Sequence, residues 1–80
     1  MKIRVYYGKQ CPRCPAAKKV CKEVAEEKNI EYEEVDIEEH MIEALQKQIA
    51  ATPSILLDDE VIFRGEIPTK EQLEKEVDKR

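Results

Sequence analysis

The chain has 80 residues, 41% of them hydrophobic and 40% charged, with a formal net charge of −4. This length supports a single domain with one modest core. Disordered chains combine low hydrophobicity with a high net charge, so this composition excludes that class. A mildly acidic chain without a basic stripe has no footprint for nucleic acid or an anionic membrane. We therefore expect one globular, monomeric domain over residues 1–80, with no nucleic-acid or membrane partner.

The first residues, MKIRVYY, have a strand pattern and lack the apolar segment of a secretory signal. No stretch approaches the roughly 18 consecutive apolar residues of a membrane-spanning helix. Three cysteines, an odd number, fit a secreted disulfide framework poorly. We therefore expect a cytoplasmic protein, in which a close cysteine pair is catalytic or metal-binding more often than structural.

The first half of the chain predicts a strand, a helix and a second strand. Residues 2–7 alternate as a strand does, with Ile3 and Val5 on one side. Residues 30–37 alternate in the same way but shift phase midway, which indicates a bulge or the end of the strand. Between them, residues 14–28 place apolar side chains at helical spacing, namely Ala17, Val20, Cys21, Val24 and Ala25.

A short helix is predicted after the second strand. Asp36 and Glu39 have the spacing of a capping box, which marks the start of a helix. The apolar stripe that follows, which we expect to face the core, consists of Met41, Ile42, Leu45 and Ile49.

The remaining residues predict a hairpin and a last helix. The runs PSILL and VIF are separated only by DDE, so they are expected to pair as antiparallel strands. Thr69 and Gln72 have the spacing of a second capping box, opening a helix that buries Leu73 and Val77. The resulting order, β-α-β-α-β-β-α, predicts an α/β fold with a four-stranded mixed sheet flanked by helices.

The stretch GKQCPRCPAAKKV contains two cysteines three residues apart at the start of the first predicted helix. A thiol attacks a disulfide only as the thiolate. The positive end of the helix dipole, together with Lys9, Arg13 and Lys18, lowers the pKa that we expect for the Cys11 thiol. Cys11 is therefore the candidate attacking thiol.

Cys14 begins the apolar stripe of this helix, so its side chain is expected to face inward. Three residues apart at a helix start, the two cysteines come close enough for a Cys11–Cys14 disulfide. Exchange through a mixed disulfide requires such a pair, one thiol exposed to attack and the other placed to resolve. Cys21 lies two turns further along the helix, about 10 Å away, and is expected to pack in the core.

Metal binding by the same cysteines is an alternative interpretation. Structural zinc needs four ligands, and a single cysteine pair supplies two. Neither Cys21 nor His40 is placed to complete a site, and His40 is expected to be a solvated surface residue. We therefore expect no metal or cofactor within one chain. A metal or iron–sulfur carrier that bridges two chains, and a redox sensor without turnover, stay open.

Three segments together resemble one family: QCPRC after the first strand, ATPSILL before the third strand and FRGEIPTKEQLEKEV at the end. They resemble the thioredoxin-fold oxidoreductases on the glutaredoxin-like side, and the resemblance covers nearly the whole chain. The likeness is greatest to short glutaredoxin-like or thioredoxin-like proteins of archaea. It implies a thioredoxin fold and a thiol–disulfide oxidoreductase that reduces protein disulfides, with Cys11 attacking and Cys14 resolving.

The resemblance also implies roles for residues outside the cysteine pair. Pro53 is expected to be cis and to pack against the dithiol, and the Thr52 backbone is expected to pair with an incoming substrate strand. Gln10, Arg13 and Gly65 complete the candidate substrate-binding residues. The implied partners are disulfide-bearing proteins, together with a reductase or glutathione as the electron donor.

The chain departs from the family pattern at several positions. Thioredoxins carry a Trp before the motif and a buried Asp six residues before its first cysteine, where this chain has Gln10 and Val5. Water or a nearby lysine must therefore accept the proton of Cys14. Glutaredoxins that bind glutathione carry Gly-Gly and an acidic pair after the last strand, whereas this chain has Gly65-Glu66. We therefore favour protein substrates, with a glutathione-dependent glutaredoxin as the alternative.

Overall fold

The computed structural model describes all 80 residues and contains a four-stranded sheet with three helices. The elements are β1 (Lys2–Tyr7), α1 (Cys14–Lys28), β2 (Glu31–Asp36), α2 (Met41–Gln46), β3 (Ser54–Leu57), β4 (Glu60–Arg64) and α3 (Lys70–Asp78). The strands lie in the order β2-β1-β3-β4. β1 is parallel to β2 and antiparallel to β3, and β3 is antiparallel to β4. The predicted element order and mixed sheet are therefore confirmed.

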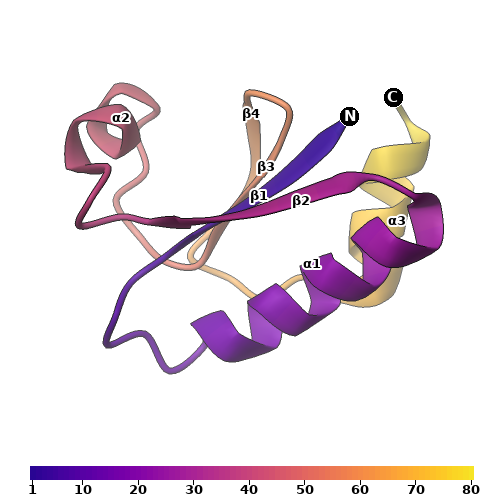
Figure 1. Cartoon of the computed structure of the whole chain (residues 1–80), viewed down its shortest axis with the longest axis horizontal. Coiled ribbons are helices and arrows are strands. Elements are labelled where there is room, and N and C mark those ends of the chain that lie inside the picture. The colour runs from indigo at the N-terminus through magenta and orange to yellow at the C-terminus, as the bar shows by residue number, and fades with distance from the viewer.

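The pleat of β1 divides the core between the two faces of the sheet. Ile3 and Val5 point to the face that α1 and α3 cover, where they pack against Leu73 in the larger cluster of buried side chains. Tyr6 points to the other face and packs with Leu56 in a smaller cluster beside α2. Figure 1 shows this arrangement, with α1 on one side of the sheet and α2 on the other.

The second helix does not begin with the predicted capping box. Asp36 is the last residue of β2, and its Oδ1 accepts a hydrogen bond from the Glu38 N–H at 2.9 Å. The Asp36 carbonyl accepts from the His40 N–H at 3.1 Å, so both groups of Asp36 hold a turn instead of a helix end. Because this turn uses residues 37–40, α2 begins only at Met41, without a side-chain cap.

The predicted orientation of this helix is also wrong. Three members of the expected apolar stripe are exposed, Met41 at 57%, Ile42 at 75% and Leu45 at 68%. The fourth, Ile49, is buried but lies beyond the end of α2. The helix packs on the sheet through Ala44 and Glu43, because the Tyr6 hydroxyl donates a hydrogen bond to Glu43 Oε1 at 2.7 Å. Burial, then the contact with Glu43, raises the pKa of Tyr6, so its hydroxyl remains a donor.

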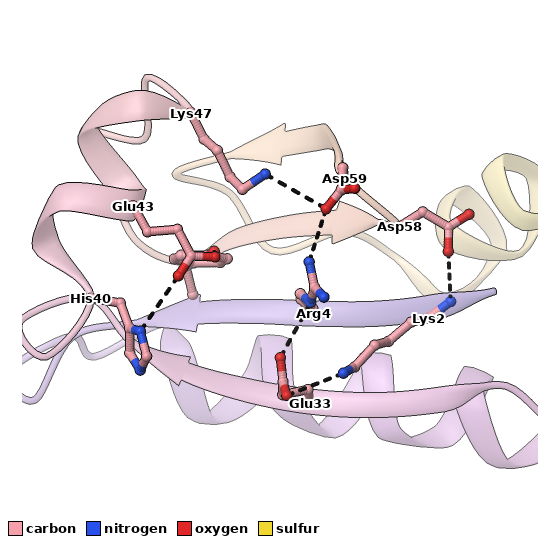
Figure 2. A network of polar contacts seen from close by, with 9 residues as sticks. Lys2, Arg4, Glu33, His40, Glu43, Lys47, Asp58 and Asp59 are labelled. Carbon is pink, nitrogen blue, oxygen red and sulfur yellow. Dashed lines mark hydrogen bonds and ion pairs between the residues drawn. The ribbon is translucent and has the colours of Figure 1, made fainter.

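Charged side chains lie on the face of the sheet that carries α2, on the part that α2 does not cover (Figure 2). Glu33 on β2 contacts Lys2 at 3.1 Å and the Nε of Arg4 at 3.2 Å, although the latter contact lacks hydrogen-bond geometry. Arg4 also donates from Nη1 to Asp59 in the β3–β4 turn at 3.1 Å. Hydrogen bonding to Lys2 is the main reason that the pKa of Glu33 is lowered. These ion pairs join β1 to its neighbours, and Lys47 adds a contact with Asp59 at 3.7 Å.

The hairpin and the last helix follow the sequence prediction. Asp58 has a φ of 55°, so an aspartate takes the left-handed position that glycine often fills in such turns. Thr69 and Gln72 make both hydrogen bonds of the capping box at the start of α3. Leu73 and Val77 are buried, as expected.

We predict that Tyr6→Phe lowers the free energy of unfolding by about 1–2 kcal/mol, because it removes the hydrogen bond that fixes α2 on the sheet. Urea unfolding followed by circular dichroism measures this loss. Tyr7→Phe is the matched control, since it keeps the ring that the Lys18 ammonium contacts at 3.6 Å. Equal stability of the two variants would contradict the role given to Tyr6.

Candidate redox site

Cys11 and Cys14 form a disulfide just after the carboxyl end of β1. Their Cα atoms are 5.5 Å apart, within the usual range for a disulfide. The turn that carries Cys11 is closed by a hydrogen bond from its N–H to the Gly8 carbonyl at 3.3 Å. α1 begins at Cys14 with Pro15 in its first turn, where the missing backbone N–H has no partner to lose.

The two sulfur-bearing residues differ in exposure. Cys14 is 2% exposed and lies on the buried side of α1 with Ala17 and Cys21. Cys11 precedes the helix and is partly exposed. Cys11 is therefore accessible from solvent, whereas Cys14 is shielded by the fold.

The electrostatic surroundings of the pair are only partly as predicted. The first turn of α1 contains no acidic residue and Arg13 provides no side-chain cap, so the positive end of the helix is not offset locally. Lys9, however, lies 3.8 Å from Glu38, and Lys18 lies 3.6 Å from Glu34. Because each lysine contacts a carboxylate, its positive charge is partly neutralised. The sequence prediction missed this pairing.

The segment before β3 lies beside the dithiol. The Thr52–Pro53 peptide bond is cis, as the family resemblance implies. A methyl group placed on Gly8 would lie 3.4 Å from Thr52 Oγ1 and 3.9 Å from Cys11 Cβ, so the three residues are close neighbours. The segment is braced from within by Ser54, whose buried hydroxyl donates to the Ala51 carbonyl at 2.6 Å.

Gly65, after β4, connects both parts of the site. Its N–H donates to the Pro53 carbonyl at 2.8 Å, and its carbonyl accepts from Arg13 Nη1 at 3.0 Å. Gly65 has a φ of +71°, and a methyl group there would lie 2.9 Å from Ala51 Cβ. Glycine is therefore strongly favoured at this position.

The candidate substrate-binding residues differ in the contacts that they make in this site. The contacts just described place Thr52 near Cys11 and join Pro53, Gly65 and Arg13 to one another. Gln10 is exposed in the turn before Cys11 and makes no side-chain hydrogen bond. Sequence reasoning missed Ser54, although a serine at the head of the apolar run SILL was a visible signal.

The other candidate metal or thiol groups lie apart from the pair. Cys21 is fully buried in the larger core cluster, and burial raises the pKa of its thiol to about 12. His40 is half exposed and its Nδ1 lies 3.4 Å from Glu43. No three His, Cys, Asp or Glu side chains are grouped so as to hold a metal ion.

None of the helices has the length and apolar character needed to cross a membrane.

Known proteins resemble this chain over nearly its full length. Residues 1–78 match the family model described as the thioredoxin domain. A thioredoxin of Methanocaldococcus jannaschii is 39% identical over 82 residues, covering 100% of this chain and 95% of that protein. A thioredoxin of Methanothermobacter thermautotrophicus is 32% identical over 75 residues, covering 94% of this chain and 95% of that protein. The solved structure of thioredoxin 1 from Thermosipho africanus has a TM-score of 0.73 at 21% identity, covering 98% of this chain and 96% of that one.

The chain therefore belongs to the thioredoxin domain family. With its cysteine pair, it is a protein-disulfide oxidoreductase. The resemblance to thioredoxin-fold proteins of archaea is confirmed. Its placement on the glutaredoxin-like side stays a prediction, because the relatives described above are thioredoxins.

We predict that Gly65→Ala destabilises the protein by roughly 1–3 kcal/mol, through left-handed backbone strain and the contact with Ala51. Thermal and urea unfolding measure the loss. Gly8→Ala is the control, since the backbone at Gly8 does not have a positive φ and a methyl group there would have no contact closer than 3.4 Å. The double variant Ala51→Gly/Gly65→Ala is expected to recover part of the stability. A Gly65→Ala variant as stable as Gly8→Ala would contradict this account.

Proposed function

We propose that the protein reduces disulfides in other proteins, with Cys11 as the attacking thiol and Cys14 as the resolving thiol. The observation that carries this proposal is the unequal exposure of the two cysteines. Cys11 is partly exposed and Cys14 is 2% exposed, yet their Cα atoms are only 5.5 Å apart. An accessible nucleophile backed by a shielded second thiol suits exchange through a mixed disulfide.

The reaction has two exchange steps. The Cys11 thiolate attacks one sulfur of the substrate disulfide, forming a bond between Cys11 and the substrate while the substrate S–S bond breaks. The displaced substrate thiolate takes up a proton. Cys14, as thiolate, then attacks the Cys11 sulfur, forming the Cys11–Cys14 disulfide and releasing the second substrate thiolate, which is also protonated. Two electrons and two protons thus reach the substrate, and the enzyme is left in the disulfide form.

The proton of Cys14 has no carboxylate acceptor at the position where thioredoxins carry a buried aspartate. Val5 takes that position here and is fully buried in the apolar core cluster. Lys18 lies one helical turn after Cys14, but its ammonium contacts Glu34 and the Tyr7 ring. We therefore assign the proton to water that reaches the site as Cys11 and Cys14 separate.

The segment before Pro53 offers backbone groups to a substrate. Thr52 lies outside the strands, and neither its N–H nor its carbonyl takes part in a hydrogen bond within the chain. Because Thr52 neighbours Cys11 across Gly8, an extended substrate segment that pairs with it would bring its disulfide to Cys11. This supports a substrate with a peptide backbone around its disulfide, since such a backbone supplies the matching hydrogen-bond partners.

The surroundings of Gly65 argue against glutathione as the electron donor. Its carbonyl is already occupied by Arg13 and its N–H by Pro53, so this glycine has little left to offer the γ-glutamyl end of glutathione. We therefore favour a reductase as the donor.

Turnover with thioredoxin reductase and NADPH, compared with glutathione and glutathione reductase, separates the two donors.

We predict that Cys11→Ser lowers the rate of insulin disulfide reduction with dithiothreitol by about 10³-fold or more, because the attacking thiol is lost. Cys14→Ser is expected to accumulate a mixed disulfide with the substrate, which mass spectrometry detects. Cys21→Ala is the matched control and is expected to retain turnover, because that thiol is buried and its pKa is raised to about 12. Full activity of Cys11→Ser, or a substrate adduct on Cys14 in the wild type, would contradict the assignment.

A further inference from the structure

Lys18 lies one helical turn after the buried Cys14. The two residues are four apart on α1, so their side chains are neighbours on one side of the helix, with Cβ atoms about 6 Å apart. Side chains in a helix lean toward its N-terminus, which directs Lys18 back over the turn that carries Cys14. The ammonium group of Lys18 is therefore placed at the dithiol end of α1.

Two contacts hold this ammonium group. Its Nζ lies 3.6 Å from the centroid of the Tyr7 ring and 3.6 Å from Glu34 Oε1. Tyr7 is the last residue of β1 and directly precedes Gly8, where an added methyl group would lie 3.9 Å from Cys11 Cβ. The side chain of Lys18 is 28% exposed, so water screens its charge less than it would on an open surface.

Glu34 lies beside Val5, the position where thioredoxins carry a buried aspartate. The two residues are paired in the parallel register of β1 and β2, so both side chains are on the face that α1 covers. The Tyr32 hydroxyl donates a hydrogen bond to Glu34 Oε2 at 2.8 Å. Burial, then this contact with Glu34, raises the pKa of Tyr32, so its hydroxyl remains the donor. A carboxylate and an ammonium group are therefore present on the α1 face, although the core position itself is apolar.

Few charges on the surrounding elements can act on Cys14. Arg13 is directed to the Gly65 carbonyl, Lys9 is paired with Glu38, and burial raises the pKa of the Cys21 thiol to about 12. The contacts of α3 with charged residues of α1 involve Glu27 and Lys28, at the other end of that helix. The titratable and charged groups near Cys14 on its own segment, β1 and β2 are Lys9, Cys11, Arg13, Lys18, Cys21, Tyr7, Tyr32 and Glu34. Lys18 and Glu34 are thus the opposed charges one turn from Cys14.

We propose that Lys18 is a positioning residue for the second exchange step, in which its ammonium group stabilises the Cys14 thiolate that attacks Cys11. In this step Cys14 gives its proton to water, its thiolate forms the Cys11–Cys14 bond, and the substrate sulfur leaves as a thiolate. The positive charge increases the fraction of Cys14 that is thiolate, whereas Glu34 offsets part of that charge. The inference rests on the proposed function, because it concerns the resolving step of the same reaction.

The test mixes the reduced protein with one equivalent of dithiodipyridine, an uncharged aromatic disulfide that releases a light-absorbing thiopyridone at each exchange step. Attack by Cys11 gives a first phase that depends on concentration, and resolution by Cys14 gives a second phase that does not. Lys18→Met is expected to slow the second phase about two- to threefold at pH 7, and to move its increase with pH to higher pH. Lys18→Arg keeps the charge and is expected to retain the wild-type second phase.

Glu34→Gln separates an electrostatic role from a structural one. It removes the same ion pair as Lys18→Met but leaves the ammonium group unopposed, so it is expected to speed the second phase and to move its increase to lower pH. Loss of a merely structural ion pair would instead change both variants in the same direction. Lys19→Met is the matched control, because Lys19 is exposed at the next position of the same helix, and it is expected to keep the wild-type rate.

Two results would overturn the inference and leave the proposed function intact. One is an unchanged second phase in Lys18→Met, and the other is a second phase slowed by both Lys18→Met and Glu34→Gln. Circular dichroism checks that each variant is folded, and the first phase is expected to change less than the second. A wild type that shows no second phase would instead overturn the proposed function, and the inference with it.

Discussion

The redox site depends on two hydrogen bonds made by the backbone of Gly65. Its N–H binds the Pro53 carbonyl at 2.8 Å and its carbonyl binds Arg13 at 3.0 Å, so one residue joins the segments before β3 and before α1. A side chain at this position would meet a left-handed φ and the nearby Ala51 Cβ, so glycine makes both bonds at the lowest cost. The dithiol and its neighbouring backbone are thus positioned by residues far apart in the chain but adjacent at one end of the sheet.

The two faces of the sheet serve different purposes. α1 and α3 cover one face with a continuous apolar core, which gives α1 a fixed position and Cys14 a buried one. On the other face, the short α2 covers only part of the sheet, and ion pairs around Arg4 occupy the rest (Figure 2). The larger core cluster thus lies on the α1 side, whereas the apolar side chains Met41, Ile42 and Leu45 stay exposed on α2.

Local patterns predicted most of the fold and the centre of the site. Alternation and helical spacing gave the element order, the capping box at Thr69 marked α3, and the spacing of Cys11 and Cys14 marked the dithiol. The orientation of α2 was not predictable in this way, because it depends on Glu43 meeting Tyr6, 37 residues away in the chain. The same holds for the bond from Arg13 to Gly65, whose partners are 52 residues apart. Helical periodicity identifies an apolar stripe but not whether another element covers it.

The proposed exchange depends on a difference between Cys11 and Cys14 in their access to solvent. The most direct test is the rate at which iodoacetamide alkylates each cysteine of the reduced, folded protein at pH 7, resolved by peptide mass spectrometry. We predict that Cys11 reacts at least about tenfold faster than Cys14, since the reactive cysteine of a dithiol site is the accessible one. Equal rates, or faster labelling of Cys14, would contradict the account.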